Sequence, residues 1–335
     1  MSTHGHSPNL CGVLSETKRI FRANSRHFLA LSILFLLPLS FAYILYPSLI
    51  ITTSHTNSIT SHYRQSLFIF SYTVPDPSYP PSQKSYLLIT LFYLLFWFLF
   101  SIFATASITY STFNGFYSRP VNFISSIKSI LFSFFPLLVT VIASQIILIL
   151  IFFIFGLFAA FVYEGIVTLG IDVDYRSNYL LGFVICTTIL ILVLTIYLQV
   201  EWSLAYVVVV VVESKWGFAP LKRSAYLING MKWVALSIML YYGMLTGSLA
   251  MSFSTLASYL GGINSGWGFI LQAVVVSVLM TISMLYYIAA HSVLYVYCKV
   301  LHGEMVFEIA DESAADYVSL PVDDGKGPHV LYVVP

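Results

Sequence analysis

The stretch that decides the fold lies between Lys128 and Glu164. Residues 129–163 read SILFSFFPLLVTVIASQIILILIFFIFGLFAAFVY, with no Asp, Glu, Lys or Arg among them. A helix needs about 20 apolar residues to cross a bilayer, and inside the bilayer its backbone groups must bond to one another because no water reaches them. The stretch therefore predicts a transmembrane helix.

The composition of the whole chain agrees with this interpretation. Hydrophobic residues make up 59% of the 335 positions and charged residues only 9%. Soluble domains hold about 25% charged residues, and a chain so poor in charge cannot cover a water-facing surface. The class of soluble globular proteins is therefore excluded.

Four more stretches lack the four charged residue types, namely 27–63, 85–118, 177–200 and 233–298. The last is too long for one crossing and is interrupted by GGINSG at 261–266, a turn-forming cluster that predicts a helical hairpin. The expected fold is an all-α polytopic membrane bundle with six transmembrane helices. The predicted spans are about 28–51, 86–113, 134–163, 179–212, 233–258 and 267–298, within a single transmembrane domain of residues 1–302.

The basic residues predict the orientation. Twelve lie in the segments outside the predicted spans on one side, and Arg64, Lys84 and Arg176 lie on the other. The excess of Lys and Arg on the cytosolic side of membrane proteins puts both termini in the cytosol. The first span is expected to act as a retained signal anchor. The membrane is the endoplasmic reticulum or the plasma membrane, which the sequence does not distinguish.

Each odd-numbered span is preceded by a segment that is amphipathic at helical spacing. These segments, at about 10–26, 120–133 and 217–230, predict three cytosolic-side interfacial helices whose basic residues meet anionic lipid. Their regular spacing suggests a pseudo-threefold repeat, whereas the alternative is that basic residues at any membrane boundary look amphipathic. The candidate lipid-headgroup ligands are Lys18, Arg19, Arg22, Lys222 and Arg223.

A family resemblance rests on residues 213–230, which read ESKWGFAPLKRSAYLING and lead into a span, and on DYVSLP at 316–321. The layout over about residues 10–320 resembles a family of uncharacterised plant transmembrane proteins. It is more remotely similar to the membrane domain attached to some bacterial glycerophosphodiester phosphodiesterases. The resemblance implies no assigned chemistry. No soluble phosphodiesterase domain accompanies these residues, so that activity is not expected here, and a structural role as helix cap and turn explains the motif.

Two intramembrane polar residues are the main site candidates. Glu201 lies about 11 residues before the end of its predicted span, or about 16 Å at 1.5 Å per residue. A carboxylate at that depth normally faces the bundle interior with a partner, and His291 is the nearest plausible one. One interpretation is a protonated Glu201 that fixes helix packing. The other is a polar cavity shared by Glu201 and His291.

No motif indicates a catalytic site, a metal or another cofactor. Cys11, Cys186 and Cys298 lie far apart, and the Asp172 and Asp174 pair lacks the further ligands of a calcium loop. The tail of residues 303–335 is acidic and predicts a largely disordered cytosolic segment that could dock a soluble partner. Its negative charge argues against nucleic acid as a partner.

Three functions remain open. The first is a non-enzymatic membrane protein that organises lipids or assists other membrane proteins. The second is a transporter or channel for a small or lipid-like solute, suggested by intramembrane Glu201 and His291. The third is a lipid-metabolising enzyme, which would need paired acidic or histidine groups at one depth, so an enzymatic activity is the least expected.

Overall fold

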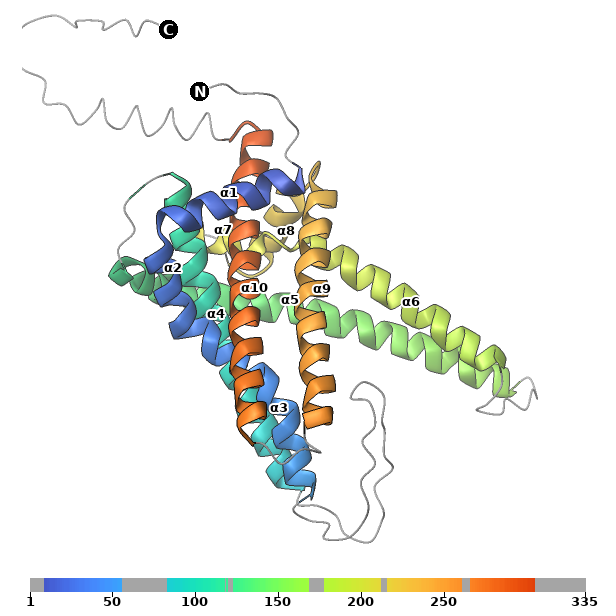
Figure 1. The fold of residues 1–335 in the computed structure, drawn as a ribbon. Coiled ribbons are helices and arrows are strands. Elements are labelled where there is room, and N and C mark those ends of the chain that lie inside the picture. Colours follow the sequence, from blue (N-terminus) through green and yellow to red (C-terminus); the bar gives the residue numbers. More distant parts are fainter. Residues whose placement is uncertain are drawn as a thin grey trace, which may run out of the picture.

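The computed structural model describes residues 9–55, 83–117, 119, 123–168, 178–211, 216–260 and 266–304, and this part of the chain is all-α. The predicted tail beyond residue 304, the loop carrying Asp172 and Asp174, and Glu213 of the motif lie outside the described residues. Figure 1 shows the arrangement of the helices. They are α1 (Leu10–Ala23), α2 (Ser25–Leu31), the π-helix η1 (Ser32–Leu36), α3 (Leu37–His55), α4 (Gln83–Phe116), α5 (Phe123–Thr168), α6 (Asn178–Glu201), α7 (Ala205–Val211), α8 (Phe218–Leu227), α9 (Lys232–Leu260) and α10 (Gly266–Leu301).

Within the described ranges, six stretches of helix are long and apolar enough to cross a membrane, which agrees with the predicted number. They are Ser25–Pro47, Leu87–Phe116, Phe123–Gly165, Gly182–Val211, Lys232–Thr255 and Trp267–Leu301. Most of these helix ends lie within a few residues of the predicted span ends, and the membrane boundaries themselves stay a prediction. The largest difference is at the third, where the helix starts 11 residues before the predicted residue 134.

The core lies around α10, which packs against α1, α3, α4 and α9. Small side chains let the helices come close together, and Ala289 and Ala290 of α10 are fully buried. Hydroxyl groups join neighbouring helices, since Thr281 of α10 donates to Ser40 of α3 over 3.0 Å. We refer to α3, α4, α9 and α10 as the central bundle.

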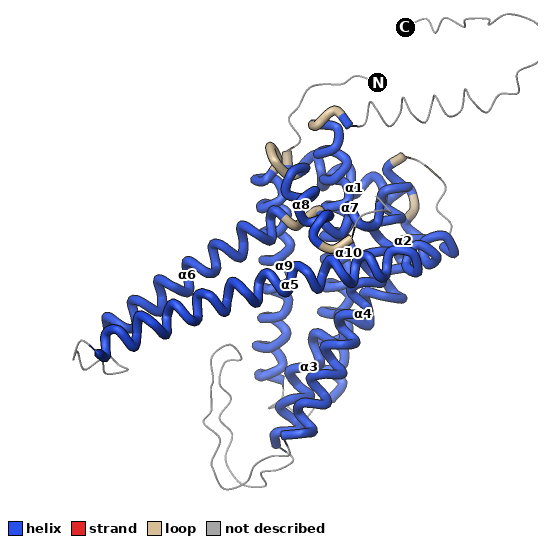
Figure 2. Tube along the Cα trace, turned by 180° about the vertical axis from the view of Figure 1, so that it is seen from behind, coloured by secondary structure: helices blue, strands red, loops and turns tan. Residues whose placement is uncertain are grey.

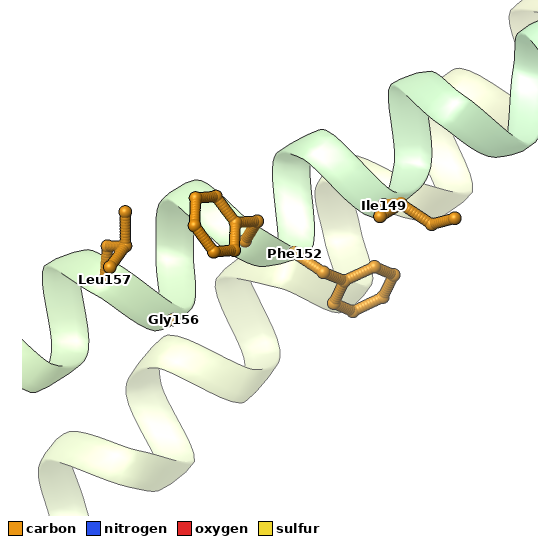
Figure 3. Close-up of a pocket in the computed structure, with 5 residues that line it drawn as sticks. Ile149, Phe152, Gly156 and Leu157 are labelled. Atoms are coloured by element: carbon orange, nitrogen blue, oxygen red, sulfur yellow. The ribbon is translucent and has the colours of Figure 1, made fainter.

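Helices α5 and α6 form a second unit that runs obliquely away from the central bundle (Figures 1 and 2). We call this helical pair the arm. Most side chains of its outer half are exposed and apolar, and a surface notch of about 500 Å³ on α5 is lined by Ile149, Phe152, Phe153, Gly156 and Leu157 (Figure 3). A surface of this kind is suited to lipid or to other membrane helices.

The segment 120–133 differs from the expectation of a separate interfacial helix. Its described part, from Phe123, is the first three turns of α5, which continues to Thr168 without interruption. Pro136 does not end the helix, and Thr140 donates to the Pro136 carbonyl over 2.8 Å. An amphipathic stripe can therefore belong to the end of a long spanning helix as well as to a separate helix on the surface.

The fourth span also differs from a straight helix. Residues 202–204 form a turn between α6 and α7, and α7 lies buried among α4, α5, α8 and α10. At the first span, the π-helix η1 comes just before Pro38, whose nitrogen cannot donate, and the wider helical turn absorbs the irregularity.

The three segments predicted as interfacial helices each pack against a spanning helix. The first helix, α1, packs on α10, the start of α5 lies beside the end of α4, and α8 packs on α7. The start of α5 and helix α8 each contact the helix that comes just before them in the chain. Helix α1, which comes first, contacts the last spanning helix instead. The pseudo-threefold repeat itself stays a prediction.

Candidate functional site at the basic end of the bundle

Helix α1 lies across α10 with one apolar face (Figure 1). Its side chains Val13, Thr17 and Ile20 are buried, and the ring of Phe21 lies 4.6 Å from that of Tyr286 in α10. The opposite face carries exposed Lys18, Arg19 and Arg22. Arg19 forms an ion pair with Glu16, while Lys18 and Arg22 form none with the described residues.

Helix α8 is bounded by two glycines in the left-handed region, Gly217 with φ of 73° and Gly230 with φ of 99°. A side chain at either position would strain the backbone, and a Cβ at Gly230 would also approach Leu301 to 3.2 Å. The Gly217 amide donates to Thr140 of α5 over 3.2 Å. These contacts fix both ends of α8. The glycines of the motif at residues 213–230 therefore form the turns that bound the helix.

The buried face of α8 holds the helix break in place. Ser224 is fully buried, and its hydroxyl donates to the Glu201 carbonyl over 2.6 Å and accepts from the Leu204 amide over 3.1 Å. A broken helix leaves backbone groups without their usual partners, and each one left unbonded in the interior costs about 1–3 kcal/mol. One hydroxyl therefore satisfies both sides of the break between α6 and α7.

The outer face of α8 carries Lys222 and Arg223. Lys222 is exposed and forms no ion pair with the described residues. Arg223 reaches the end of α10 and forms an ion pair with Glu304, just after the turn at Gly303 with φ of 71°. The two helices α1 and α8 thus lie on two sides of the point where α10 ends.

Glu201 lies at the base of the arm and has a basic partner. Its carboxylate is 2.8 Å from the ammonium group of Lys232, the first residue of α9, which also lies 3.4 Å from the Tyr197 hydroxyl. Because α6 ends at Glu201 and the chain then turns, the straight-helix count that placed it near mid-membrane does not apply. Glu201 is level with the start of α9.

His291 is fully buried in α10, and its Nδ1 bonds to the Tyr287 carbonyl over 2.9 Å. Its ring lies 6.2 Å from that of Tyr206 in α7, and among the described residues its Nε2 has no hydrogen-bond partner. The structure therefore joins Glu201 to Lys232, and His291 to Tyr287 and Tyr206. A shared Glu201 and His291 site stays a prediction.

The sequence interpretation missed one polar cluster. Nε2 of His27 in α2 lies 3.0 Å from the Ser111 hydroxyl and 3.3 Å from the Ser126 hydroxyl, and the two serines lie 2.9 Å apart. The cluster joins α2, the end of α4 and the start of α5. No spacing rule links residues 84 and 99 positions apart, so the sequence held no signal for it.

The charges at this end are strongly unequal. The described residues there include ten basic ones and three acidic ones, on α1, α8 and the ends of α2, α4, α5, α6, α9 and α10. The basic ones are Lys18, Arg19, Arg22, Arg26, Arg119, Lys128, Lys222, Arg223, Lys232 and Lys299; the acidic ones are Glu16, Glu201 and Glu304. We call this region the basic end.

A family model described as Domain of unknown function (DUF8558) matches residues 8–320, nearly the whole chain. The chain belongs to the DUF8558 family. No curated protein and no solved structure matches it. An uncharacterised family with six candidate spans agrees with the coarse expectation from the motif at 213–230. The kinship to plant proteins and to phosphodiesterase-linked membrane domains stays a prediction.

Metal binding has no support among the described residues of this DUF8558 chain. They contain no group of three or more His, Cys, Asp or Glu placed to hold an ion. The three cysteines are free and apart, with Cys11 and Cys186 exposed and Cys298 buried.

Proposed function

We propose that this chain is a non-enzymatic multi-pass membrane protein that gathers anionic lipids around its basic end. The observation that carries the proposal is the position of α1 and α8 at the ends of the spanning helices, with Lys18, Arg22 and Lys222 exposed and not ion-paired to any described residue. An exposed Lys or Arg near an anionic membrane surface contributes about 1 kcal/mol to association.

The unequal charge also supports an orientation. Lys and Arg concentrate on the cytosolic side of membrane proteins, so the basic end and both termini lie in the cytosol in this proposal. Single cysteines at Ser58, Ser177 and Ser313, in a chain without its native cysteines, test this point. An impermeant maleimide added to sealed cells is expected to label the first two only. Labelling of the Ser313 site alone would reverse the orientation.

The function is tested by the lipid shell of the protein reconstituted in phosphatidylcholine vesicles. Electron paramagnetic resonance compares the association of spin-labelled phosphatidylserine with that of spin-labelled phosphatidylcholine. We expect a preference for phosphatidylserine that weakens with salt. Replacing Lys18, Arg22 and Lys222 with Gln is expected to lower it by up to about fivefold per residue, since each contributes about 1 kcal/mol.

The matched control is Lys84→Gln, because Lys84 lies in the first turn of α4, at the opposite end of that helix from Arg119. This variant is expected to keep the preference. An equal preference in the triple variant and the wild type would reject the proposal, as would an equal loss in the Lys84 variant.

A second function, transport of a small polar solute, has one observation in its favour. Broken helices line the solute sites of many transporters. Here the turn at 202–204 includes buried Ser203 and lies near half-buried Tyr206 and buried His291, and each of the three carries a buried polar atom with no bonding partner among the described residues. A cysteine at Ser203 that reacts with a small impermeant thiosulfonate would support a water-filled path. Complete protection until unfolding would remove this function.

A further inference from the structure

We propose that the acidic C-terminal segment, residues 305–324, binds the basic surface of α1 and α8 and competes there with anionic lipid. The occupant is this chain's own tail. The competition rests on the proposed lipid function, whereas the docking of the tail does not.

The first contact of the proposed docking lies within the described part of the chain. Arg223 of α8 already holds Glu304, and the ring of Tyr226 lies 5.0 Å from that of His302. Gly303, with φ of 71°, turns the chain out of α10 directly before Glu304. The chain therefore leaves α10 already bound to α8.

The other side of the exit is bounded by α1. This helix packs on α10, and Ile20 of α1 lies against Gly115 at the end of α4, whose neighbour Phe116 has its ring 6.4 Å from that of Tyr297 in α10. The described chain thus ends, at Glu304, beside two basic helices. Lys18, Arg22 and Lys222 offer the segment 305–324 three charges that have no acidic partner among the described residues.

The charge of the segment complements this surface. It contains six carboxylates and no Lys or Arg; they are Glu308, Asp311, Glu312, Asp316, Asp323 and Asp324. An extended chain spans about 3.3 Å per residue, so Glu312 can lie up to about 26 Å from Glu304. A 14-residue helix such as α1 is about 21 Å long. The carboxylates from Glu308 to Glu312 can therefore reach side chains along the whole length of α1.

Tethering makes the competition effective. A segment attached next to its binding surface acts at an effective concentration in the millimolar range, with no dissociation into bulk solution. Anionic lipid must then displace carboxylates before it reaches Lys18 and Arg22. The basic end is consequently open to lipid only in the fraction of molecules whose tail is released.

The test joins two measurements on the full-length chain. Spin labels on cysteines at Ser15, exposed on α1, and at Ser313 report the distance from the tail to α1 in pure phosphatidylcholine vesicles, with the native cysteines replaced. The first tail variant carries Glu308, Asp311, Glu312 and Asp316 as Gln or Asn. The second has residues 305–324, apart from position 313, in scrambled order with the same composition.

We expect a short distance in the wild type and in the scrambled variant, and a longer one in the neutral variant and in high salt. In vesicles with spin-labelled phosphatidylserine, the neutral variant is expected to raise the lipid preference about threefold or more. A tail distance that neither neutralisation nor salt changes would reject the docking, whatever the lipid result. A docked tail whose neutralisation leaves lipid preference unchanged would reject the competition. If the Lys18, Arg22 and Lys222 variant also keeps its lipid preference, the proposed function itself fails.

Discussion

The central bundle and the arm are both apolar enough to cross a membrane, but they differ in how much of their surface is buried. Of the 18 most apolar consecutive residues, 44% are buried in α10, 17% in α9 and 11% in α4, compared with 6% in α5 and 6% in α6. The bundle has small residues and hydroxyl bonds between its helices, such as Ala290 and the Thr281 bond to Ser40. The arm has large apolar side chains directed outward. Apolar residues alone suffice to place a helix in lipid, but contact between helices needs small and polar ones.

The arm is held mainly at its base. Besides the packing of the start of α5 against α4, polar contacts there include the Ser224 bonds across the break, the Gly217 bond to Thr140 and the Glu201 pair with Lys232. All three involve α8 or the residues that flank it. The structure therefore predicts that polar contacts around α8 help to fix the position of the arm, together with the packing of the start of α5, whereas the bundle depends on close packing along its length.

The largest effect is expected for Ser224→Ala. This change leaves the Leu204 amide and the Glu201 carbonyl unbonded in a buried place, at about 1–3 kcal/mol each. We expect the free energy of unfolding in mixed micelles to fall by about 2–4 kcal/mol, and amide exchange in α7 to rise.

The control for this change is Ser237→Ala, because the Ser237 hydroxyl bonds only to the Trp233 carbonyl of its own helix. A shift below about 0.5 kcal/mol is expected there. Equal stability of the Ser224 and Ser237 variants would show that the break does not need the hydroxyl.

A matched pair of substitutions compares the two regions directly. Ala290→Leu places a larger side chain at a fully buried position of α10 and is expected to destabilise the protein by about 1–3 kcal/mol. Ala160→Leu makes the same change on the exposed surface of α5 and is expected to stay within about 0.5 kcal/mol. Thermal unfolding in detergent measures both. If Ala160→Leu cost as much as Ala290→Leu, the arm would be packed against a partner in the membrane.

The smallest effect is expected for the ion pair at the base of the arm. Lys232 and Glu201 are 35% and 18% exposed, and partly exposed ion pairs contribute about 0.2–1 kcal/mol. A double-mutant cycle with Lys232→Gln and Glu201→Gln is expected to give a coupling in that range. A cycle between Lys222→Gln and Glu201→Gln should give none. A Lys232 and Glu201 coupling above about 2 kcal/mol would indicate a desolvated pair and a different depth for Glu201.

The sequence predicted the six spans because absence of charge over 20 residues or more has few other physical meanings in a chain of this composition. It predicted α1 and α8 because their apolar stripes recur at helical spacing. It did not predict that α5 begins at Phe123, since the same stripe fits a surface helix and the end of a spanning one. Periodicity reports which face is apolar, and it does not report where a helix stops.

The candidate site was predicted less well, for a related reason. The break after Glu201 falls at Trp202, Ser203 and Leu204, with no Gly or Pro to mark it. Its stabilising contact comes from Ser224, which lies 20 residues or more further along the chain. The depth of Glu201 and its pairing with Lys232 depend on this tertiary contact. The lipid-headgroup candidates on α1 and α8 could be chosen from sequence because they depend only on local amphipathicity.

The most direct test of the lipid function is photo-crosslinking with a diazirine in the lipid headgroup. The protein is reconstituted with either an anionic or a zwitterionic probe, and the labelled peptides are identified by mass spectrometry. We predict that the anionic probe labels Leu10–Ala23 and Phe218–Leu227 more strongly than the zwitterionic probe does, and that the start of α4 shows no such difference. Equal labelling of α1 and α8 by the two probes would contradict the account.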